Sequence, residues 1–445
     1  MRLNTSYKQI LSISIPIMLG SATQNIIALS DSVFLYHLSE TDFAAIGFVG
    51  VFYLIIASIG YAFSKGGQIL IARRYGENNR SGVSNTFYSV LGLITILSVM
   101  MFMFMEFASR WFFGLFIDSE VILEKSLEYL DYRSWGVFFS YAGVVFIALY
   151  TGIAKTSFII VDALILAIVN IALNYALIFG HWGMPQMGIA GAGLASSIAE
   201  VVAVLVFLVY MLKDRFLKEY NFFHWPAIDW KLAKDSLRIS LPIVAQSIVG
   251  LGSWFFFFGI VENLGERQLA VTNLVRIVYL ILSIPCWGYA TGINTLVSNF
   301  IGNKKRFAVI PLIWKTTKLS ALNTILIALP VLLSPEFFLY PLLGGQDPSL
   351  IHEAQPIFYV LLGILLLFST GSIYFNGMIG TGASFYGLKL QFLGAFFYVV
   401  YVYLTVNVFE LSLTWAWAGE LLYWAGIGLF AAIYLGSLKW HKLSF

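Results

Sequence analysis

An aspartate stands in the middle of an apolar stretch, where its carboxyl group can bind a proton or a cation. The stretch is QNIIALSDSVFLYHL, residues 24–38, and no basic residue lies within four positions of Asp31. An ionised carboxylate that faced lipid would cost at least ~2.5 kcal/mol, and acidic residues inside membrane spans are functional by default. We therefore interpret Asp31 as a residue that faces protein or water and takes up a proton or a cation. A structural carboxylate, bonded to neighbouring helices, is the alternative.

Two asparagines share one face of a second apolar segment, LAIVNIALNYALIFG. Asn170 and Asn174 are four residues apart, which places them about one turn apart on a helix. Buried amides in a membrane need hydrogen-bond partners. The pair could complete a polar cluster with Asp31 and Gln24 that holds a proton, a water molecule or a sodium ion. The spacing favours equally a second interpretation, interhelical hydrogen bonds worth about 0.6 kcal/mol per contact.

The following segment, GIAGAGLASSIAE, offers a hydroxyl group and a carboxyl group. Its small residues are typical of close helix packing, and Ser196 is a weaker site candidate. Glu200 falls near the middle of the expected span, so it either joins the expected polar cluster around Asp31 or faces a cytoplasmic cavity. Two further acids, Asp162 and Glu420, are expected near helix ends and in contact with water.

The composition around these residues is that of a membrane protein. Of the 445 residues, 59% are hydrophobic and 11% are charged, and the mean hydropathy is +0.84. A soluble protein carries about 25% charged residues, so a protein with many membrane spans is the class that fits. The net charge of +3 comes without a basic stripe, which argues against a nucleic-acid partner. The single cysteine, Cys286, excludes an internal disulfide and a paired-cysteine metal site.

Hydropathy predicts twelve membrane-spanning helices, because a bilayer core needs about 20 apolar residues per helix. The expected spans are 9–37, 43–71, 83–107, 126–153, 157–180, 188–212, 236–262, 268–299, 310–335, 354–379, 384–408 and 413–437.

Loop charges predict the orientation of these spans. The loops after the second, sixth and eighth spans are basic, with residues such as Arg73, Lys213 and Lys304, whereas intervening loops carry acids such as Glu40 and Asp118. Basic loops stay in the cytoplasm. We therefore expect a multi-pass protein of the cell membrane with both termini in the cytoplasm.

The chain repeats itself at an offset of 226 residues, the separation of Pro16 and Pro242. The offset aligns SISIP with RISLP, and it also pairs Gly66 with Gly292 and Arg80 with Arg306. A constant offset over two helices and a loop indicates a duplication.

The duplication predicts an all-α membrane protein with two six-helix lobes related by a pseudo-two-fold axis. The expected lobes are residues 1–212 and 236–445, joined by a cytoplasmic linker at 213–235. Parallel repeats of this kind are typical of transporters that bind substrate between their lobes and expose it to each side in turn.

The repeat pairs Asp31 with Phe257, within SWFFFFGIVE, so the two halves do not share a polar site. We expect the second half to contribute aromatic surface to substrate binding, because organic cations bind well against aromatic faces. The candidates are Trp254 and Phe257, with Arg276 as a cation that could face the cavity. The expected substrate site therefore combines these three residues with Gln24 and Asp31.

No enzyme or nucleotide-binding motif stands out in the sequence. HExxH, Walker A and nucleophile-elbow motifs are missing, and no histidine pair has metal-ligand spacing. We expect neither enzymatic activity nor a bound cofactor, and a proton or sodium gradient as the source of energy.

Several motifs, taken in order, resemble the signatures of the multidrug and toxic compound extrusion (MATE) family of the MOP flippase superfamily. The first half carries ISIPIMLGSATQNIIALSDSVFL, LSETDFAAIGF, SKGGQILIARRYGENNR, YTGIAKTSFIIV, NIALNYALIFG and MGIAGAGLASSIAE. The second half carries LPIVAQS, LVSNFIGNKKR and GMIGTGASF as counterparts.

The resemblance implies twelve helices in a V-shaped pair of lobes and export of drugs or organic cations by a monomer. It also implies that the first-helix aspartate, Asp31, couples export to a proton or sodium gradient. The first-helix glutamine maps onto Gln24, the fifth-helix polar pair onto Asn170 and Asn174, and the sixth-helix hydroxyl onto Ser196. A sodium ion, if bound, would sit at Asp31, Asn170 and Asn174.

The chain departs from the family pattern in ways that bear on the coupling ion. Proton-coupled relatives often carry an aspartate at the position of Asn174, followed by proline where this chain has Tyr175. The acids that another branch places in spans 7 and 10 are missing, which leaves no expected ion site in the second half. We favour protons over sodium. A lipid-linked oligosaccharide flippase of the same superfamily is the alternative function, although few cations are available to bind its pyrophosphate.

Overall fold

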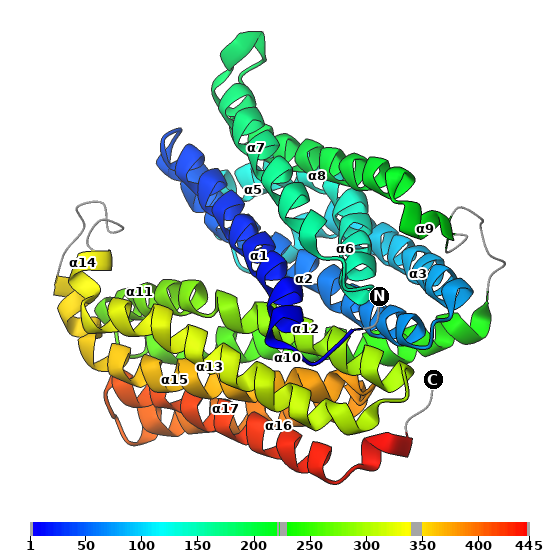
Figure 1. The fold of residues 1–445 in the computed structure, drawn as a ribbon. Helices are drawn as coiled ribbons and strands as arrows, with labels where there is room; N and C mark the ends of the chain where they lie inside the picture. The colour runs from blue at the N-terminus through cyan, green and yellow to red at the C-terminus, as the bar shows by residue number, and fades with distance from the viewer. Residues whose placement is uncertain (1–2, 220–221, 223–228, 340–348, 443–445) are drawn as a thin grey trace. The chain divides into compact units, whose positions relative to one another are not determined.

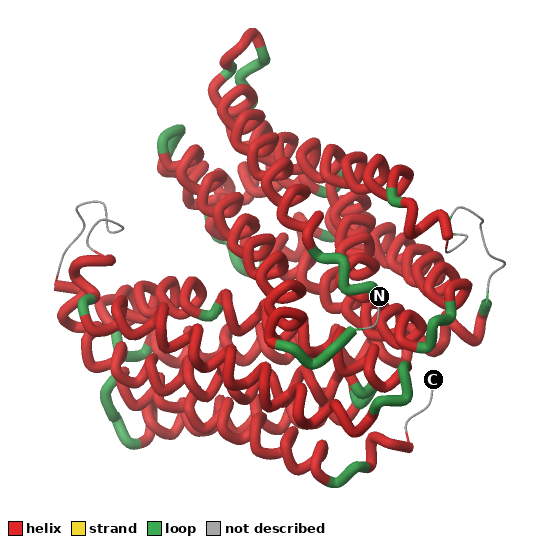
Figure 2. The backbone as a smooth tube through the Cα atoms, in the orientation of Figure 1, coloured by secondary structure: helices red, strands yellow, loops and turns green. Residues whose placement is uncertain are grey.

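A computed structural model describes residues 3–219, 222, 229–339 and 349–442. Every regular element in these ranges is a helix, and none is a strand (Figure 2). The all-α class predicted from hydropathy is therefore confirmed.

The helices follow the expected spans closely, and their labels are those of Figure 1. The helices that carry the fold are α1 (Tyr7–Tyr36), α2 (Glu40–Gly76), α3 (Arg80–Phe107), α5 (Glu120–Arg133), α6 (Gly136–Gly152), α7 (Ser157–Phe179), α8 (Gly188–Lys213), α10 (Trp230–Glu262), α11 (Glu266–Leu282), α12 (Ile284–Gly302), α13 (Val309–Leu333), α15 (Ser349–Gly380), α16 (Ser384–Tyr403) and α17 (Leu413–Gly436). Three helices of one turn or so are α4 (Ser109–Phe113), α9 (Arg215–Glu219) and α14 (Pro335–Leu339).

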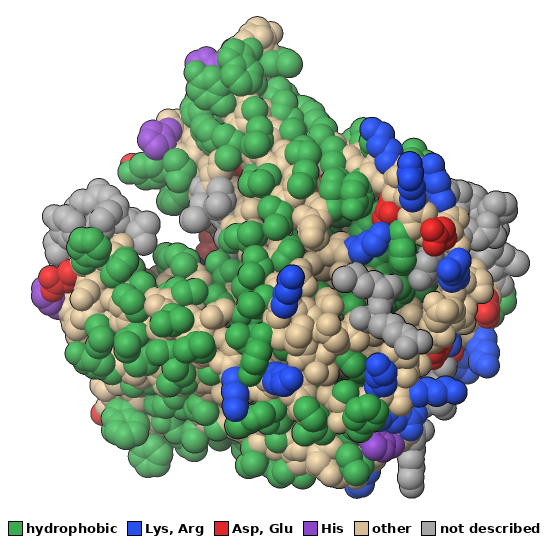
Figure 3. All heavy atoms as spheres, viewed as in Figure 1, with side chains coloured by type: hydrophobic (Ala, Val, Ile, Leu, Met, Phe, Trp, Pro, Cys, Tyr) green, Lys and Arg blue, Asp and Glu red, His purple; other side chains and the backbone are tan. Residues whose placement is uncertain are grey.

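In the described ranges, nine helices are long and apolar enough to cross a membrane, or eleven if two bent pairs each count as one span. With α1, a further 30-residue helix, these match the twelve expected spans. Hydrophobic side chains cover much of the face seen in Figure 3. Many large hydrophobic side chains are mostly exposed, such as Phe255 at 72%. A surface of this kind suits lipid, which takes the place of water around the spans.

Two spans that the sequence predicts as continuous are broken in the structure. The pair α5 and α6 bends by 55°, and the pair α11 and α12 bends by 45°. The second break has a clear cause, because Pro285 stands in the first turn of α12 and has no N–H group to continue the hydrogen bonding of α11.

The chain divides into two compact units, and two helices contribute to both. Unit 1 contains Met1–Met18 with Pro242–Phe445, and unit 2 contains Leu19–Leu241. The division falls just after Pro16 in α1 and at Pro242 in α10, the two prolines that the repeat aligns. The units differ from the expected lobes in where α1 and α10 are assigned, and the expected lobes stay a prediction.

The same close helix contact occurs once in each unit. In unit 2, a Cβ atom added to Gly66 of α2 would lie 2.7 Å from the Cα atom of Ser240 in α10. In unit 1, a Cβ atom on Gly292 of α12 would lie 2.5 Å from the Oγ atom of Ser14 in α1. Gly66 pairs with Gly292, and Ser14 with Ser240, at the offset of 226 residues found in the sequence. The internal repeat is therefore a structural repeat.

These contacts predict that Gly66→Ala destabilises the protein by about 1–3 kcal/mol, the usual cost of overpacking. The added methyl group would meet the Ser240 Cα atom in the backbone of α10, which cannot move aside as a flexible side chain can. Gly47→Ala is the matched control, because it lies on the same helix and a Cβ atom there meets nothing within 4 Å. Thermal unfolding of both variants in detergent measures the difference, and equal melting temperatures would contradict the prediction.

Candidate functional site

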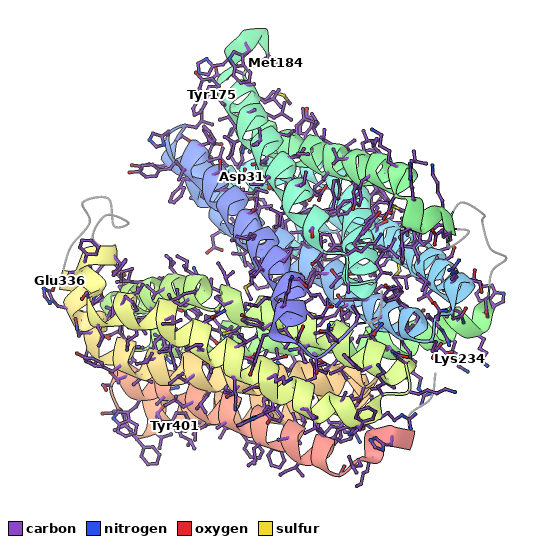
Figure 4. All side chains as sticks on the ribbon, viewed as in Figure 1. Asp31, Tyr175, Met184, Lys234, Glu336 and Tyr401 are labelled. Carbon is purple, nitrogen blue, oxygen red and sulfur yellow. The ribbon has the colours of Figure 1, made fainter. Side chains whose placement is uncertain are left out.

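Three helices of unit 2 bring the expected polar residues together. Asp31 lies near the end of α1, Asn170 and Asn174 lie on α7, and Ser196 lies on α8. Figure 4 labels Asp31 on α1, next to α7. All four side chains are buried, and the most exposed of them, Asp31, is only 8% exposed. We call these four residues the Asp31 cluster.

Hydrogen bonds join the Asp31 cluster into a closed network. The Asn174 side-chain N–H donates to Asp31 Oδ1 at 2.5 Å, and the Ser196 hydroxyl donates to Asp31 Oδ2 at 3.2 Å. The Asn170 amide donates to Ser196 Oγ at 2.9 Å, and Asn174 also donates to Asn170 Oδ1 at 3.2 Å. The spacing of the two asparagines thus places both amides in one network with the carboxyl group of Asp31.

The network leaves Asp31 with neutral hydrogen-bond partners. Its carboxyl group can therefore take up a proton without first breaking an ion pair, which a lysine or arginine bound to it would require. Among the described side chains, the buried Asn174 Oδ1 atom has no hydrogen-bond donor. This oxygen and the two Asp31 oxygens are donor atoms of the kind that hard cations bind. The arrangement can hold a proton and supplies part of the oxygen shell that sodium needs.

The side chain of Gln24 lies outside the described residues, although the residue itself belongs to α1. Its predicted role in substrate binding stays a prediction.

Glu200 pairs with Arg133 and makes no described contact with Asp31. The two Nη atoms of Arg133 donate to the Glu200 carboxylate at 2.8 and 2.7 Å, and the guanidinium lies 3.8 Å from the centre of the Tyr53 ring. The two side chains are 9% and 15% exposed. Arg133 also acts on Asp31 through its charge. Glu200 therefore neutralises the cation that faces the Asp31 cluster, a role that the sequence did not indicate.

The aromatic residues expected at the substrate site lie in unit 1. Phe257 is 1% exposed and packs against Trp417 and Tyr398. Trp254 stacks on Tyr279 with a ring separation of 5.7 Å. This burial favours a packing role for Phe257. Its part in substrate binding, and that of Trp254, stay predictions.

The cation expected with these aromatic residues also lies in unit 1. The guanidinium of Arg276 is 5.3 Å from the centre of the Phe258 ring, and its Nε atom has no acceptor among the described residues. A guanidinium on an aromatic face is held by cation–π attraction. Contact of Arg276 with substrate stays a prediction.

Two acids are buried where the sequence predicts contact with water. Asp162 is 6% exposed, and Glu420 is 3% exposed. The prediction is wrong because neighbouring side chains cover both residues, although each stands near the start of its helix. Asp162 stands five residues after the start of α7 at Ser157, and Glu420 stands seven residues after the start of α17 at Leu413. Local sequence gives no signal of this burial, because it depends on which helices enclose each segment.

We expect Ser196→Ala to weaken the Asp31 cluster by about 1 kcal/mol. The change removes a hydrogen-bond donor to Asp31 and a hydrogen-bond acceptor for Asn170. Each buried polar group left without a partner lowers the free energy of unfolding by about 1–3 kcal/mol. We expect a loss at the lower end of this range, because polar groups in an unfolded membrane protein find other partners.

A small drop in melting temperature in detergent is the measurable consequence of Ser196→Ala. Ser58→Ala is the matched control, because the hydrogen bond that the structure gives to the Ser58 hydroxyl among the described residues is to the carbonyl of Ile55 in its own helix. The prediction fails if the two alanine variants unfold at the same temperature.

Comparison with known proteins gives a family match and several relatives. A family model described as MatE matches residues 16–176 and 242–404, which fall in both halves of the repeat. A probable multidrug resistance protein NorM from Thermotoga maritima is 24% identical over 442 residues, which are 98% of this chain and 93% of that protein. Multidrug resistance protein MdtK from Pectobacterium atrosepticum is 24% identical over 246 residues, which are 54% of this chain and 52% of that protein.

Solved structures share the fold. An outward-facing multidrug resistance MATE family transporter of the MOP superfamily matches with a TM-score of 0.87 at 20% identity, over 97% of this chain and 96% of that chain. A MOP superfamily transporter from Pyrococcus furiosus matches with the same TM-score, identity and coverage.

Proposed function

Because the chain belongs to the MatE family of multidrug and toxic compound extrusion transporters, we propose that it is a cation-coupled antiporter that exports organic cations and drugs. Relatives named as multidrug resistance proteins support this substrate class. The protein would act in the cell membrane as a monomer, with both termini in the cytoplasm and without a cofactor. None of these relatives' names favours the lipid-linked oligosaccharide flippase.

The Asp31 cluster is the proposed coupling site, and one observation carries the proposal. Asp31 is a buried acid whose hydrogen-bond partners, Asn174 and Ser196, are neutral. A carboxylate in an apolar membrane span is costly unless it binds a cation or a proton. Its charge can therefore be switched by a gradient, whereas a carboxylate held by arginine would stay ionised.

A proton is the favoured coupling ion. Proton binding needs only the Asp31 carboxyl group, and the surrounding amides and hydroxyl can bond to either of its charge states. Sodium would need the free Asn174 Oδ1 atom, both Asp31 oxygens and further oxygen ligands. Among the described residues, no group of three or more His, Cys, Asp and Glu residues could hold a metal ion.

The proposed cycle alternates between the two membrane faces. Substrate binds from the cytoplasm with Asp31 ionised. A proton from outside then binds Asp31, α1 adjusts near Pro16, and substrate leaves outward. The return to the inward-facing state releases the proton inside. Gln24, Asp31, Trp254, Phe257 and Arg276 are the proposed substrate contacts.

Export from vesicles under separately imposed gradients tests this function. Purified protein is reconstituted into lipid vesicles, and transport of ethidium or a fluoroquinolone is followed with a proton gradient alone or a sodium gradient alone. We expect the proton gradient to drive transport of the drug and the sodium gradient to have little effect. Transport driven by sodium alone would reverse the ion assignment, and transport driven by neither gradient would refute coupling.

A further inference from the structure

A second buried acid, Glu420 of α17, lies in unit 1. It is 3% exposed. The polar side chains near its carboxyl group are those of Tyr398, Trp424, Trp254, Tyr279 and Tyr423. Among the described residues, neither lysine nor arginine is one of its electrostatic partners. An acid in the apolar interior of a membrane protein, whose described polar neighbours are tyrosines and tryptophans, has no cation beside it to balance a negative charge.

Aromatic rings enclose this carboxyl group. Trp417, which lies one turn before Glu420 on α17, is fully buried and packs edge-on against Trp254. Trp424 donates its indole N–H to the Tyr279 hydroxyl at 3.2 Å. We call Trp254, Tyr279, Tyr398, Trp417, Tyr423 and Trp424 the aromatic shell.

The chemistry of the aromatic shell favours a proton as the ligand of Glu420. Indole N–H groups donate hydrogen bonds but offer no lone pair to a metal ion. Sodium would therefore find the carboxylate and a few phenol oxygens, which is a poor oxygen shell. An organic cation would need space between the rings, but Trp417, Tyr398 and Tyr279 are packed in the core of unit 1. A proton needs no space and removes the charge that the shell does not balance.

The structure also supplies groups that can respond when the proton leaves. The Tyr398 hydroxyl lies near the carboxyl group, yet it does not form a hydrogen bond of good geometry with any described residue, and neither does the Trp417 indole N–H. Both are donors, and a carboxylate attracts donors more strongly than a protonated carboxyl does.

The helix next to the shell is also irregular. A short π-helix, Leu404–Val408, follows α16, the helix that carries Tyr398. Irregular turns of this kind are rare and often mark functional sites. The helix that carries Tyr398 therefore ends in a turn whose hydrogen bonding differs from that of a regular α-helix.

We propose that Glu420 is a second proton-binding site, separate from Asp31, whose proton is held by the aromatic shell and is exchanged when Tyr398 and Trp417 reorient. The inference concerns proton binding by this carboxyl group. It does not require the proposed transport function, so the two can fail separately.

Tryptophan fluorescence of the full-length purified protein tests the proposal, because three tryptophans surround Glu420. We expect the emission to change with pH in the wild type and in Asp31→Asn, and the same transition to disappear in Glu420→Gln. Glu262→Gln is the control, since Glu262 lies exposed at the end of α10 in the same unit. A transition that persists in Glu420→Gln, or one that disappears in Asp31→Asn, would overturn the proposal.

Two further measurements keep the test decisive. The infrared band of a protonated carboxyl group should change with pH in the wild type, and this change should move to a different pH in Tyr398→Phe, which keeps both the ring and Glu420. The infrared comparison of the wild type with Tyr398→Phe remains a test even if Glu420→Gln does not fold. An infrared change at the same pH in both proteins, or a fluorescence change produced by sodium at constant pH, would rule out the proposed proton site.

Discussion

Asp31→Asn is expected to abolish export driven by an imposed gradient while leaving the protein folded. Asparagine has nearly the shape of aspartate, so its side chain can still contact Asn174 and Ser196, which bond Asp31 in the structure. The amide cannot take up a proton and carries no charge to bind a cation. Transport in lipid vesicles with a proton gradient, and separately with a sodium gradient, measures the loss.

Two controls separate coupling from stability in this experiment. Asp118→Asn removes a carboxylate from an exposed loop, and transport by this variant should match the wild type. The melting temperature of Asp31→Asn should equal or exceed that of the wild type, because the change removes a charge that is costly to bury. Gradient-driven export at the wild-type rate in Asp31→Asn would refute the proposed coupling site.

The fold could be predicted from sequence because each membrane span is a long run of apolar residues. Lipid imposes regular helices of a minimum length, so the spans emerge without knowledge of tertiary contacts. The repeat was visible because both halves need the same residues for one close contact, which is Gly66 against Ser240 and Gly292 against Ser14. The breaks between α5 and α6 and between α11 and α12 were missed, because apolar composition continues across both.

The Asp31 cluster was predictable for a related physical reason. Polar side chains are rare in apolar spans, so those present must meet one another, and Asn170 and Asn174 do meet Asp31. Ser196 was the weaker candidate, and its assignment was strengthened by the family resemblance. Glu200 could not be assigned, because its partner Arg133 lies on a helix 67 residues away in sequence.

The two buried acids show where a reading of local sequence fails. Asp162 and Glu420 stand close to the ends of their apolar segments, and the sequence does not say how deeply each helix is enclosed by its neighbours. At Glu420 the enclosing side chains come from α10, α11 and α16 as well as α17. Burial of this kind is a property of the assembled unit, so it is seen only once the helices are packed.

The buried ion pair between Arg133 and Glu200 gives the prediction with the largest effect on stability. Arg133→Gln is expected to cost about 3–5 kcal/mol, because it leaves the largely buried Glu200 carboxylate, which is 15% exposed, without its partner. The exposed pair of Arg267 and Glu353 is the matched control, with side chains that are 42% and 40% exposed. Arg267→Gln should cost about 1 kcal/mol or less. Equal melting temperatures for the two variants, measured in detergent, would contradict this prediction.

The double variant Arg133→Gln/Glu200→Gln separates the charge of this pair from its packing. It leaves no unbalanced charge, so its stability should recover most of what Arg133→Gln loses. Glu200→Gln alone leaves Arg133 unbalanced near Asp31, on which it already acts, so the guanidinium should compete with the coupling ion and reduce export. The double variant removes this competitor and should restore export above that of Glu200→Gln. If Glu200 mattered for packing alone, the export of the single and double variants would instead follow their melting temperatures.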